Sequence, residues 1–244
     1  MAAYIIYLNH NFKNHMNFIY YIDSLSAKLS KCFHYALFLL VKKPLYLLSY
    51  NSNGNKFVCH GLMRKCSLKI NGGGNQVIVE QGVRLNNVRV SVSGYNNKLV
   101  IHKRVVFHEG GRVKLEDEGN VIEIGEGTDF MDCFFAVSDY DSKVIVGKNC
   151  LFSAKIIVRN SDVHSILNAN GKRTNPARDT IIGDRVWVAY GATILKGSTI
   201  ADDSIIGTQS VVAGIYVPQG GVAVGNPAHV VKEGVHWTRK RLRG

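Results

Sequence analysis

The chain has 244 residues, of which 46% are hydrophobic, so it can form one sizeable domain with an appendage. Its 30 Lys and Arg against 18 Asp and Glu give a net charge of +12, which favours an anionic partner unless the charge is a solvated basic tail. Five cysteines at scattered spacings, with no CxxC pair, argue against a disulfide framework or a zinc site and indicate a reducing compartment. We expect neither a signal peptide nor a membrane span, because the required patterns are missing.

Residues 1–55 form the predicted N-terminal appendage. Positions 1–50 are rich in tyrosine and aliphatic residues but contain a single acidic residue, Asp23. Within them, residues 22–41 place apolar side chains at spacings of three and four, which predicts a helix that ends before Pro44. Two interpretations stay open: the helix covers the end of the following domain or a neighbouring subunit, or it contacts a membrane surface as a peripheral arm.

A loose repeat begins near residue 75. Val79, Ile101, Ile124 and Val146 are separated by 22, 23 and 22 residues, and polar, turn-rich segments lie between them. Asn, Asp and Gly in those segments suit corners that need a positive φ. We predict one coil per repeat, about eighteen residues long with four or five more at one corner. A six-residue step within each coil predicts further inward side chains, among them Ala136 after Phe130.

The strictest pattern lies in residues 181–217, where every sixth residue is aliphatic. A period of six fits neither a helix nor a simple strand. Three six-residue units can close a triangular coil of about eighteen residues, and stacked coils form a solenoid. The aliphatic residues should point inward: Ile182, Val188, Ile194, Ile200, Ile206 and Val212.

The pattern is interrupted once, between Val158 and Ile182. This polar, turn-rich stretch predicts a loop over residues 160–180 that leaves the coil, the kind of excursion in which function is often placed. After the last hexads, residues 222–232 form the predicted exit of the solenoid, so the main domain spans 56–232. The tail, 233–244, is interpreted as a short basic helix or a disordered segment.

These residues carry a family resemblance. The hexads, the I-G-D at 182–184 and the G-N-P-A at 225–228 resemble the hexapeptide-repeat acyltransferases over roughly residues 75–232. The resemblance implies a mainly β fold, a left-handed parallel β-helix, and a homotrimer with its sites at subunit boundaries. Residues 158–187 look most similar to capsule and sialic acid O-acetyltransferases. The function implied is acetyl transfer from acetyl-CoA to a sugar hydroxyl of a capsule, O-antigen or sialic-acid-containing polysaccharide, in the cytoplasm.

The resemblance also implies site residues. His164 matches the family's general base, a role suited to an imidazole because its pKa lies near neutrality. Asp162, or a backbone carbonyl, would accept a hydrogen bond from its other ring nitrogen. Trp187 would line the acceptor and thioester site. Cys133 stands near the position of an asparagine of galactoside-type members, so the oxyanion donor is unassigned.

Ligand-binding positions follow from the same match. The coenzyme channel runs along the solenoid between subunits, and its matching positions here are Tyr190, Gly191, Gly207, Thr208, Asn226 and Lys232. For the acceptor, Asp141 could bind hydroxyl groups. Lys172 and Arg173 could bind a sugar carboxylate, because a guanidinium matches its geometry.

Three other functions remain open. N-acetyl transfer to an amino sugar or amino acid uses the same fold. A metal-dependent hydratase would need three histidines from adjacent coils, yet no solenoid histidine lies one coil from His164, so no metal is expected. A non-catalytic scaffold is compatible with repeats alone. Only the net charge supports a nucleic-acid partner, and we expect none.

Overall fold

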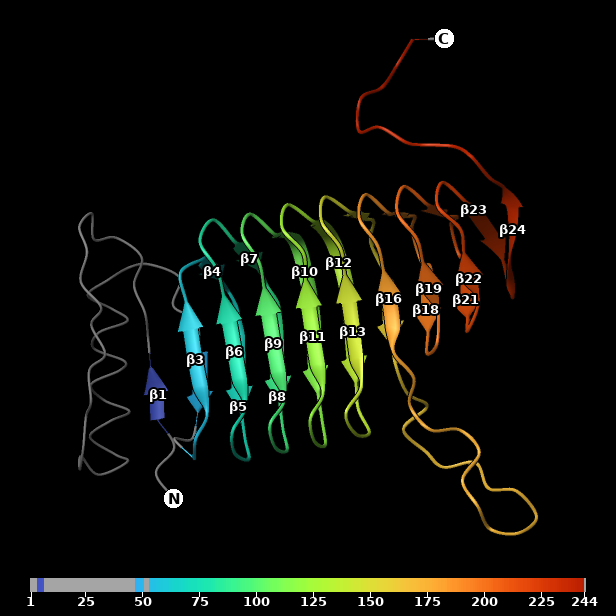
Figure 1. Cartoon of the computed structure of the whole chain (residues 1–244). Coiled ribbons are helices and arrows are strands. Elements are labelled where there is room, and N and C mark those ends of the chain that lie inside the picture. Colours follow the sequence, from blue (N-terminus) through green and yellow to red (C-terminus); the bar gives the residue numbers. More distant parts are fainter. Residues whose placement is uncertain (1–3, 7–46, 51–52, 244) are drawn as a thin grey trace.

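The computed structural model describes residues 4–6, 47–50 and 53–243. The predicted helix at 22–41 and most of the predicted appendage lie outside these residues, and the domain boundaries stay a prediction. At the N-terminal end of the sheet, β1 (Tyr4–Ile6) pairs antiparallel with β2 (Leu47–Tyr50), and β2 pairs parallel with β5 (Ser67–Ile70). From β3 to β23 the chain winds into a parallel solenoid with three faces (Figure 1).

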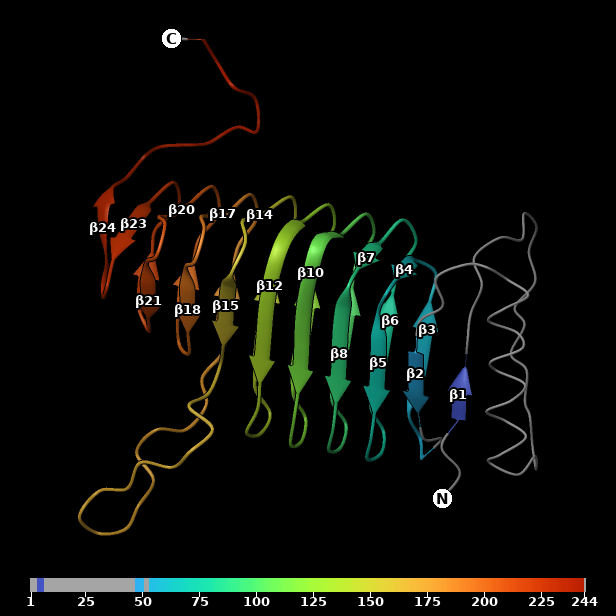
Figure 2. The same cartoon turned by 180° about the vertical axis from the view of Figure 1, so that it is seen from behind.

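Each face is a ladder of parallel strands from successive coils (Figure 2). Face one contains the first residues of β10 (Val106–Leu115) and β12 (Asp129–Val137), together with β4 (Leu62–Arg64), β7 (Arg84–Asn86), β14 (Leu151–Phe152), β17 (Trp187–Val188), β20 (Ile205–Ile206) and β23 (Val222–Gly225). Face two contains the remainder of β10 and β12, together with β5, β8 (Val88–Val92), β15 (Ile156–Arg159), β18 (Thr193–Leu195) and β21 (Val211–Ala213). Face three contains β3 (Lys56–Cys59), β6 (Gln76–Val79), β9 (Lys98–Ile101), β11 (Val121–Ile124), β13 (Lys143–Val146), β16 (Thr180–Ile182), β19 (Thr199–Ile200) and β22 (Tyr216–Val217).

The core is a column of stacked inward side chains, because each coil adds its apolar residues above those of the coil before. All six predicted hexad aliphatics are buried, so the six-residue pattern is confirmed. Phe130 stacks between Phe107 and Phe152, with ring centroids 4.4 and 4.6 Å apart. One inward position was predicted wrongly: Phe135, not Ala136, is buried, because the step from Phe130 to the next inward side chain is five residues.

The longer repeat also follows the prediction. Val79 pairs with Ile101, Ile101 with Ile124 and Ile124 with Val146, so coils of 22 or 23 residues stay in register on face three. Val146 then pairs with Ile182, although 36 residues separate them. The solenoid therefore continues across the interrupting loop without a shift in register.

The turn-rich corners between faces two and three contain a ladder of buried asparagines. The Asn75 carboxamide oxygen accepts from the Asn97 N–H at 3.0 Å, and the Asn97 oxygen accepts from the Asn120 N–H at 2.9 Å. Each asparagine also donates to carbonyls of its own coil and the next. Gly94 has a φ of +103°, and a Cβ there would lie 1.8 Å from the Asp117 carbonyl oxygen. Side-chain amides thus replace the strand hydrogen bonds that a corner interrupts.

The chain leaves the solenoid through an antiparallel hairpin, in which β23 pairs with β24 (Ala228–Lys232). The described part of the predicted tail, 233–243, contains no helix, so the helical alternative for the tail is wrong. It runs back along the edge of face one instead. The Val235 N–H donates to the Gly220 carbonyl at 3.0 Å, and the Arg239 guanidinium bonds the Asp129 carboxylate and the Cys150 carbonyl.

Candidate functional site

The loop predicted to carry function lies between β15 and β16 and projects from the lower edge of the solenoid (Figure 1). Its base is organised by Asn175, which is only 8% exposed. The Asn175 carboxamide donates to the Asp162 carboxylate and to the His164 carbonyl, both at 2.8 Å. Its oxygen accepts from the Ile166 N–H at 2.6 Å. One buried amide therefore holds both sides of the loop together.

His164 is exposed on the first turn of this loop. Its N–H donates to the Asp162 carbonyl at 2.7 Å, and the Asn175 amide binds its carbonyl, so the backbone of the residue is fixed on both sides. Within the part of the chain that the structure describes, no hydrogen bond forms to its ring nitrogens. The imidazole is consequently available to a ligand.

The Asp162 carboxylate points away from that ring and binds the Lys196 ammonium and the Asn175 amide. These two hydrogen bonds lower the pKa of Asp162, with the bond from Lys196 contributing most. Lys196 belongs to the corner after β18, in the coil that follows the loop, and it also donates to the Asn175 carbonyl at 3.2 Å. The ion pair thus fastens the loop to the next coil. The predicted contact of Asp162 with the His164 ring is absent from the described residues.

The predicted acceptor residue Arg173 is already engaged. Its guanidinium forms a fork with the Asp139 carboxylate, with N–O distances of 3.1 and 2.8 Å. Burial acts to raise the pKa of Asp139, but the hydrogen bonds from Arg173 and Ser161 outweigh it, and the pKa is lowered. A guanidinium held in this way fixes the loop against the preceding corner, and its role in binding a sugar carboxylate stays a prediction.

The other two predicted acceptor residues are exposed. Lys172 lies at the tip of the loop, where its N–H donates to the Asn168 carboxamide oxygen at 2.9 Å. Asp141 has a φ of +48° in the corner before β13, and its N–H donates to the Glu118 carbonyl at 3.0 Å. Its backbone is that of a turn residue, whereas its carboxylate faces solvent.

Trp187 lies on the outer side of face one and is 37% exposed. The tail brings a second indole beside it: the centroids of Trp187 and Trp237 are 6.1 Å apart, with their planes inclined by 47°. The Trp237 indole N–H donates to the Arg185 carbonyl at 2.5 Å. The tail therefore contributes one wall to the surroundings of Trp187.

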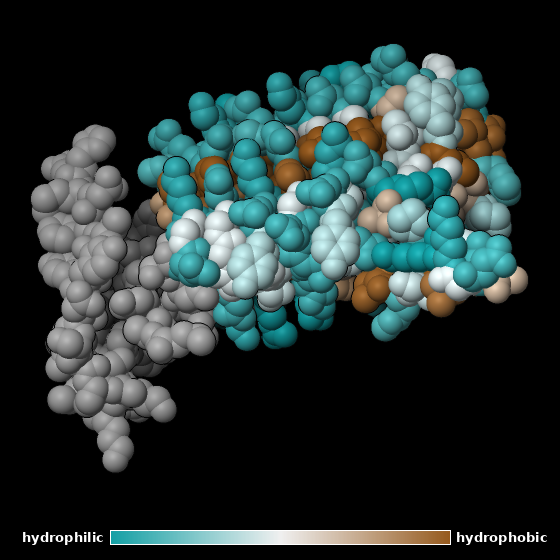
Figure 3. Space-filling model, turned by 60° about the horizontal axis from the view of Figure 1, so that its bottom comes forward, coloured by the Kyte–Doolittle hydropathy of each residue, from teal (hydrophilic) through white to brown (hydrophobic). Residues whose placement is uncertain are grey.

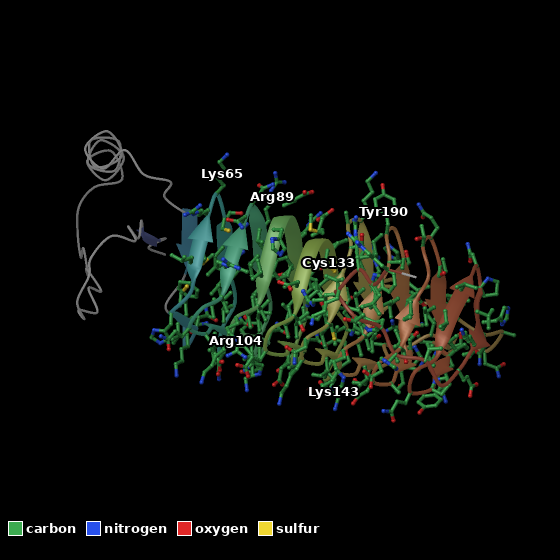
Figure 4. The ribbon with its side chains drawn as sticks, turned by 90° about the horizontal axis from the view of Figure 1, so that it is seen from above. Lys65, Arg89, Arg104, Cys133, Lys143 and Tyr190 are labelled. Atoms are coloured by element: carbon green, nitrogen blue, oxygen red, sulfur yellow. The ribbon has the colours of Figure 1, made fainter. Side chains whose placement is uncertain are left out.

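Most of the predicted coenzyme positions lie along one edge of the solenoid. The Gln209 N–H donates to the Tyr190 carbonyl, and the Gly207 N–H to the Ala223 carbonyl, each at 2.9 Å, so their turns are stacked in successive coils. Tyr190 is 38% exposed, and the Lys155 ammonium lies 5.4 Å from its ring centroid. Thr208, Asn226 and Lys232 are exposed, whereas Gly191 and Gly207 are half-buried. Tyr190 marks this side of the solenoid (Figure 4), whereas Lys232 pairs with Val222, at the other end of β23 from the turn that contains Asn226.

A single chain does not bring all the candidate residues together. Figure 2 shows β17, which carries Trp187, at the upper edge, whereas the loop with His164 leaves the lower edge. The strands of face two lie between the two edges. A site containing both His164 and Trp187 would therefore need a second copy of the chain.

Three further observations concern a metal site, the oxyanion donor and a membrane span, none of which the sequence assigned to a residue. No cluster of His, Cys, Asp and Glu there is suited to hold a metal ion, and His102 is bonded to two glutamates. Cys133 is buried in the core, which raises the pKa of its thiol, so it cannot stand in for an oxyanion donor facing the loop. No helix in the described ranges has both the length and the apolar character needed to span a bilayer.

Three contributors to the site had no role assigned from the sequence: Asn175, Lys196 and Trp237. A signal existed for Lys196, because the pairing of Val158 with Ile194 places the corner after Leu195 directly beside the base of the loop. The pairing of Arg173 with Asp139 spans 34 residues and depends on the path of the loop, which no periodicity encodes.

A parallel solenoid of six-residue units defines a class of bacterial transferases, and the model of the bacterial transferase hexapeptide (six repeats) matches residues 179–214. Polysialic acid O-acetyltransferases from Escherichia coli O1:K1 and Neisseria meningitidis are 34% and 32% identical over 91 and 92 residues. These matches cover 37% of this chain but only 29% and 43% of the relatives, less than half of either.

Two solved structures match over most of their length. The polysialic acid O-acetyltransferase OatWY has a TM-score of 0.73 at 27% identity, covering 78% of this chain and 90% of that one. The polySia-specific acetyltransferase NeuO has a TM-score of 0.73 at 32% identity, covering 80% and 89%. The chain belongs to the hexapeptide-repeat acyltransferase family, and its fold is the predicted left-handed parallel β-helix.

Proposed function

We propose that this protein is an O-acetyltransferase that moves the acetyl group of acetyl-CoA to a hydroxyl of a sialic-acid-containing or similar surface glycan. The observation that carries the proposal is the likeness to NeuO, 32% identical over 89% of that chain. The family resemblance predicts a general base at His164. The imidazole of this residue is exposed, and it lies on a loop that Asn175 and Lys196 hold in place. The reaction would take place in the cytoplasm, where acetyl-CoA is available.

The chemistry assigns one proton path to His164. A ring nitrogen takes the proton of the sugar hydroxyl while its oxygen bonds to the thioester carbonyl carbon. When the tetrahedral intermediate collapses, the carbon–sulfur bond breaks and the imidazolium returns the proton to the departing thiolate. The fixed His164 backbone limits the positions that the ring can take, which favours a productive geometry.

The separation of the two candidate edges supports a homotrimer. In a cyclic assembly, one copy supplies His164 while its neighbour supplies Trp187 and the stacked turns at Tyr190 and Gly207. Face three offers an apolar surface for such contacts: a band of outward aliphatic side chains runs along the solenoid (Figure 3). Register places its members in one row, interrupted by Glu123: Val58, Ile78, Val100, Ile145 and Ile181.

The test is acceptor-dependent release of coenzyme A thiol from acetyl-CoA, with polysialic acid as acceptor. The wild type should release thiol, and His164→Ala should lower kcat by about a hundredfold or more, the usual contribution of a general base. His60→Ala serves as the matched control, because His60 is an exposed histidine in a distant coil.

Two results would contradict the proposal. Thiol release that His164→Ala leaves intact would remove His164 as the base. Release only with amino-sugar or amino-acid acceptors would replace O-acetyl by N-acetyl transfer.

A further inference from the structure

Face two carries a row of cations that lack ionic partners. Elsewhere in the described residues, the solenoid pairs many of its charges, as in Arg104 with Glu126 and Arg185 with Asp203. On the N-terminal part of face two, only Lys114 is paired, with Glu116 at 2.6 Å. No ion pair with a described residue engages the other four cations there: Lys69, Arg89, Arg112 and Arg159. We call these five cations the basic track.

Strand register arranges the basic track along the solenoid axis. Lys69, Lys114 and Arg159 occupy one row, with Ser91 and Ala136 between them. Because neighbouring strands are about 4.8 Å apart, successive cations of this row are separated by roughly 10 Å. Arg89 and Arg112 are directly paired in the adjacent row. The positive charge is therefore periodic and in line.

An aromatic ring lies where the track approaches the candidate site. Phe134 follows Arg112 in its row, and the Arg112 and Arg159 guanidinium carbons lie 5.1 and 5.6 Å from its ring centroid. Arg159 is the last residue of β15, from which the loop carrying His164 begins. The ring and its two guanidinium groups offer an apolar and cationic surface on which a sugar ring with a carboxylate can rest.

Acidic residues border this surface. The corner segment 116–118 and Asp141 lie along the edge between faces two and three, and Asp132 lies in the part of β12 where face one passes into face two. An anionic ligand would be repelled from these edges and held over the cations. Arg104, by contrast, projects from the opposite side of the molecule to Arg89 (Figure 4).

We infer that the basic track binds an acidic polysaccharide chain and guides it toward His164. This inference rests on the proposed function and deepens it, because it identifies the acceptor as a polymer with repeated carboxylates. Several weak contacts along one chain add up, so long chains should bind much more tightly than short ones. Salt should weaken the binding, since Lys69, Arg89 and Arg112 are exposed.

The experiment measures binding of the full chain to long polysialic acid, to a sialic acid trimer and to single-stranded DNA, by calorimetry without acetyl-CoA. The test variant combines Lys69→Gln, Arg89→Gln and Arg112→Gln, and Arg104→Gln removes a cation from the opposite side as control. We expect the triple variant to lose at least about tenfold in affinity for the long chain, whereas the control keeps it. Thermal melting confirms that both variants fold.

The outcomes separate the inference from the proposed function. Equal affinity of the triple variant and the wild type for the long chain would overturn the basic track, even if acetyl transfer is observed. Equal or tighter binding of DNA would overturn its assignment to a glycan. Track-dependent binding without any acetyl transfer would support the basic track and contradict the proposed function.

Discussion

The residue His102 shows how single side chains couple successive coils. Its Nδ1 lies 3.2 Å from the Glu80 carboxylate and its Nε2 2.7 Å from that of Glu123. Only a protonated imidazole can donate to both. Burial acts to lower the pKa of His102, but the hydrogen bonds to the two glutamates outweigh it and raise the pKa. The surrounding wall also contains Lys103, Glu126, Lys148 and Asp184.

We predict that this bridge makes stability depend on pH. Because the folded pKa of His102 is raised, its contribution is fully present below the unfolded value of about 6.5 and is lost as pH rises through the folded pKa. The melting temperature should therefore fall as the pH rises from about 6.5 through the folded pKa of His102. In the variant His102→Gln, the melting temperature should depend less on pH. Parallel pH curves for the wild type and the variant would show that the bridge adds no stability.

At the scale of elements, the asparagine ladder is the feature that keeps long corners in register. Asn97 is fully buried, donates to the Ser93 and Asp117 carbonyls at 3.2 and 3.0 Å, and accepts from Asn120. Removal of its side chain leaves the Ser93 carbonyl and the Asn120 N–H without this partner, and the Asp117 carbonyl with only the Tyr95 N–H. A buried polar group left without a hydrogen bond costs about 1–3 kcal/mol, so the ladder should contribute measurably to stability.

Asn97→Ala should accordingly lower the free energy of unfolding by about 2–3 kcal/mol. Denaturant titration followed by circular dichroism measures this change. Gln76→Ala is the matched control, because it removes an exposed carboxamide one coil away and should change stability by less than about 0.5 kcal/mol. Similar losses in both variants would mean that the ladder is not the source of the stability.

The elements also show what periodicity can predict. The hexads from Ile182 to Val212 predicted the burial of their aliphatic residues, because the same position of each six-residue unit faces the axis of a triangular coil. The same rule failed at Ala136, where the step shortened to five residues within β12. The six-residue spacing predicts the inward side chains correctly where each coil repeats the preceding one. It fails where a strand continues past a corner, as β12 does.

At the scale of the whole molecule, the separation of His164 from Trp187 gives the sharpest prediction. If each site takes one residue from each of two neighbours, His164→Ala and Trp187→Ala should complement one another. In randomly mixed trimers, one site in each mixed trimer is intact, which restores about a quarter of the wild-type activity.

Co-expression of the two inactive variants, followed by the thiol-release assay, measures this recovery. Each variant expressed alone is the control. Absence of recovery in verified mixed oligomers would place both residues in a site formed within one chain, or remove one of them from the site.

The candidate site was less predictable than the fold. His164, the stacked turns and the loop itself were predicted from sequence, because they depend on local pattern and on family resemblance. The engagement of Arg173 by Asp139 and of Asp162 by Lys196 was not, since it depends on how an aperiodic loop folds back on two coils. The approach of Trp237 to Trp187 likewise depends on the return path of the tail.

The pairing of Val146 with Ile182 across the loop has a consequence for how such proteins diversify. The scaffold closes beneath the loop as if nothing had been inserted, so the loop is tethered at two ends that neighbouring strands hold in place. Doubling the length of such a tethered segment costs only about 0.6 kcal/mol of chain entropy. The loop is therefore an exchangeable cassette: it can be lengthened, shortened or replaced during evolution while the coils that present it remain unchanged.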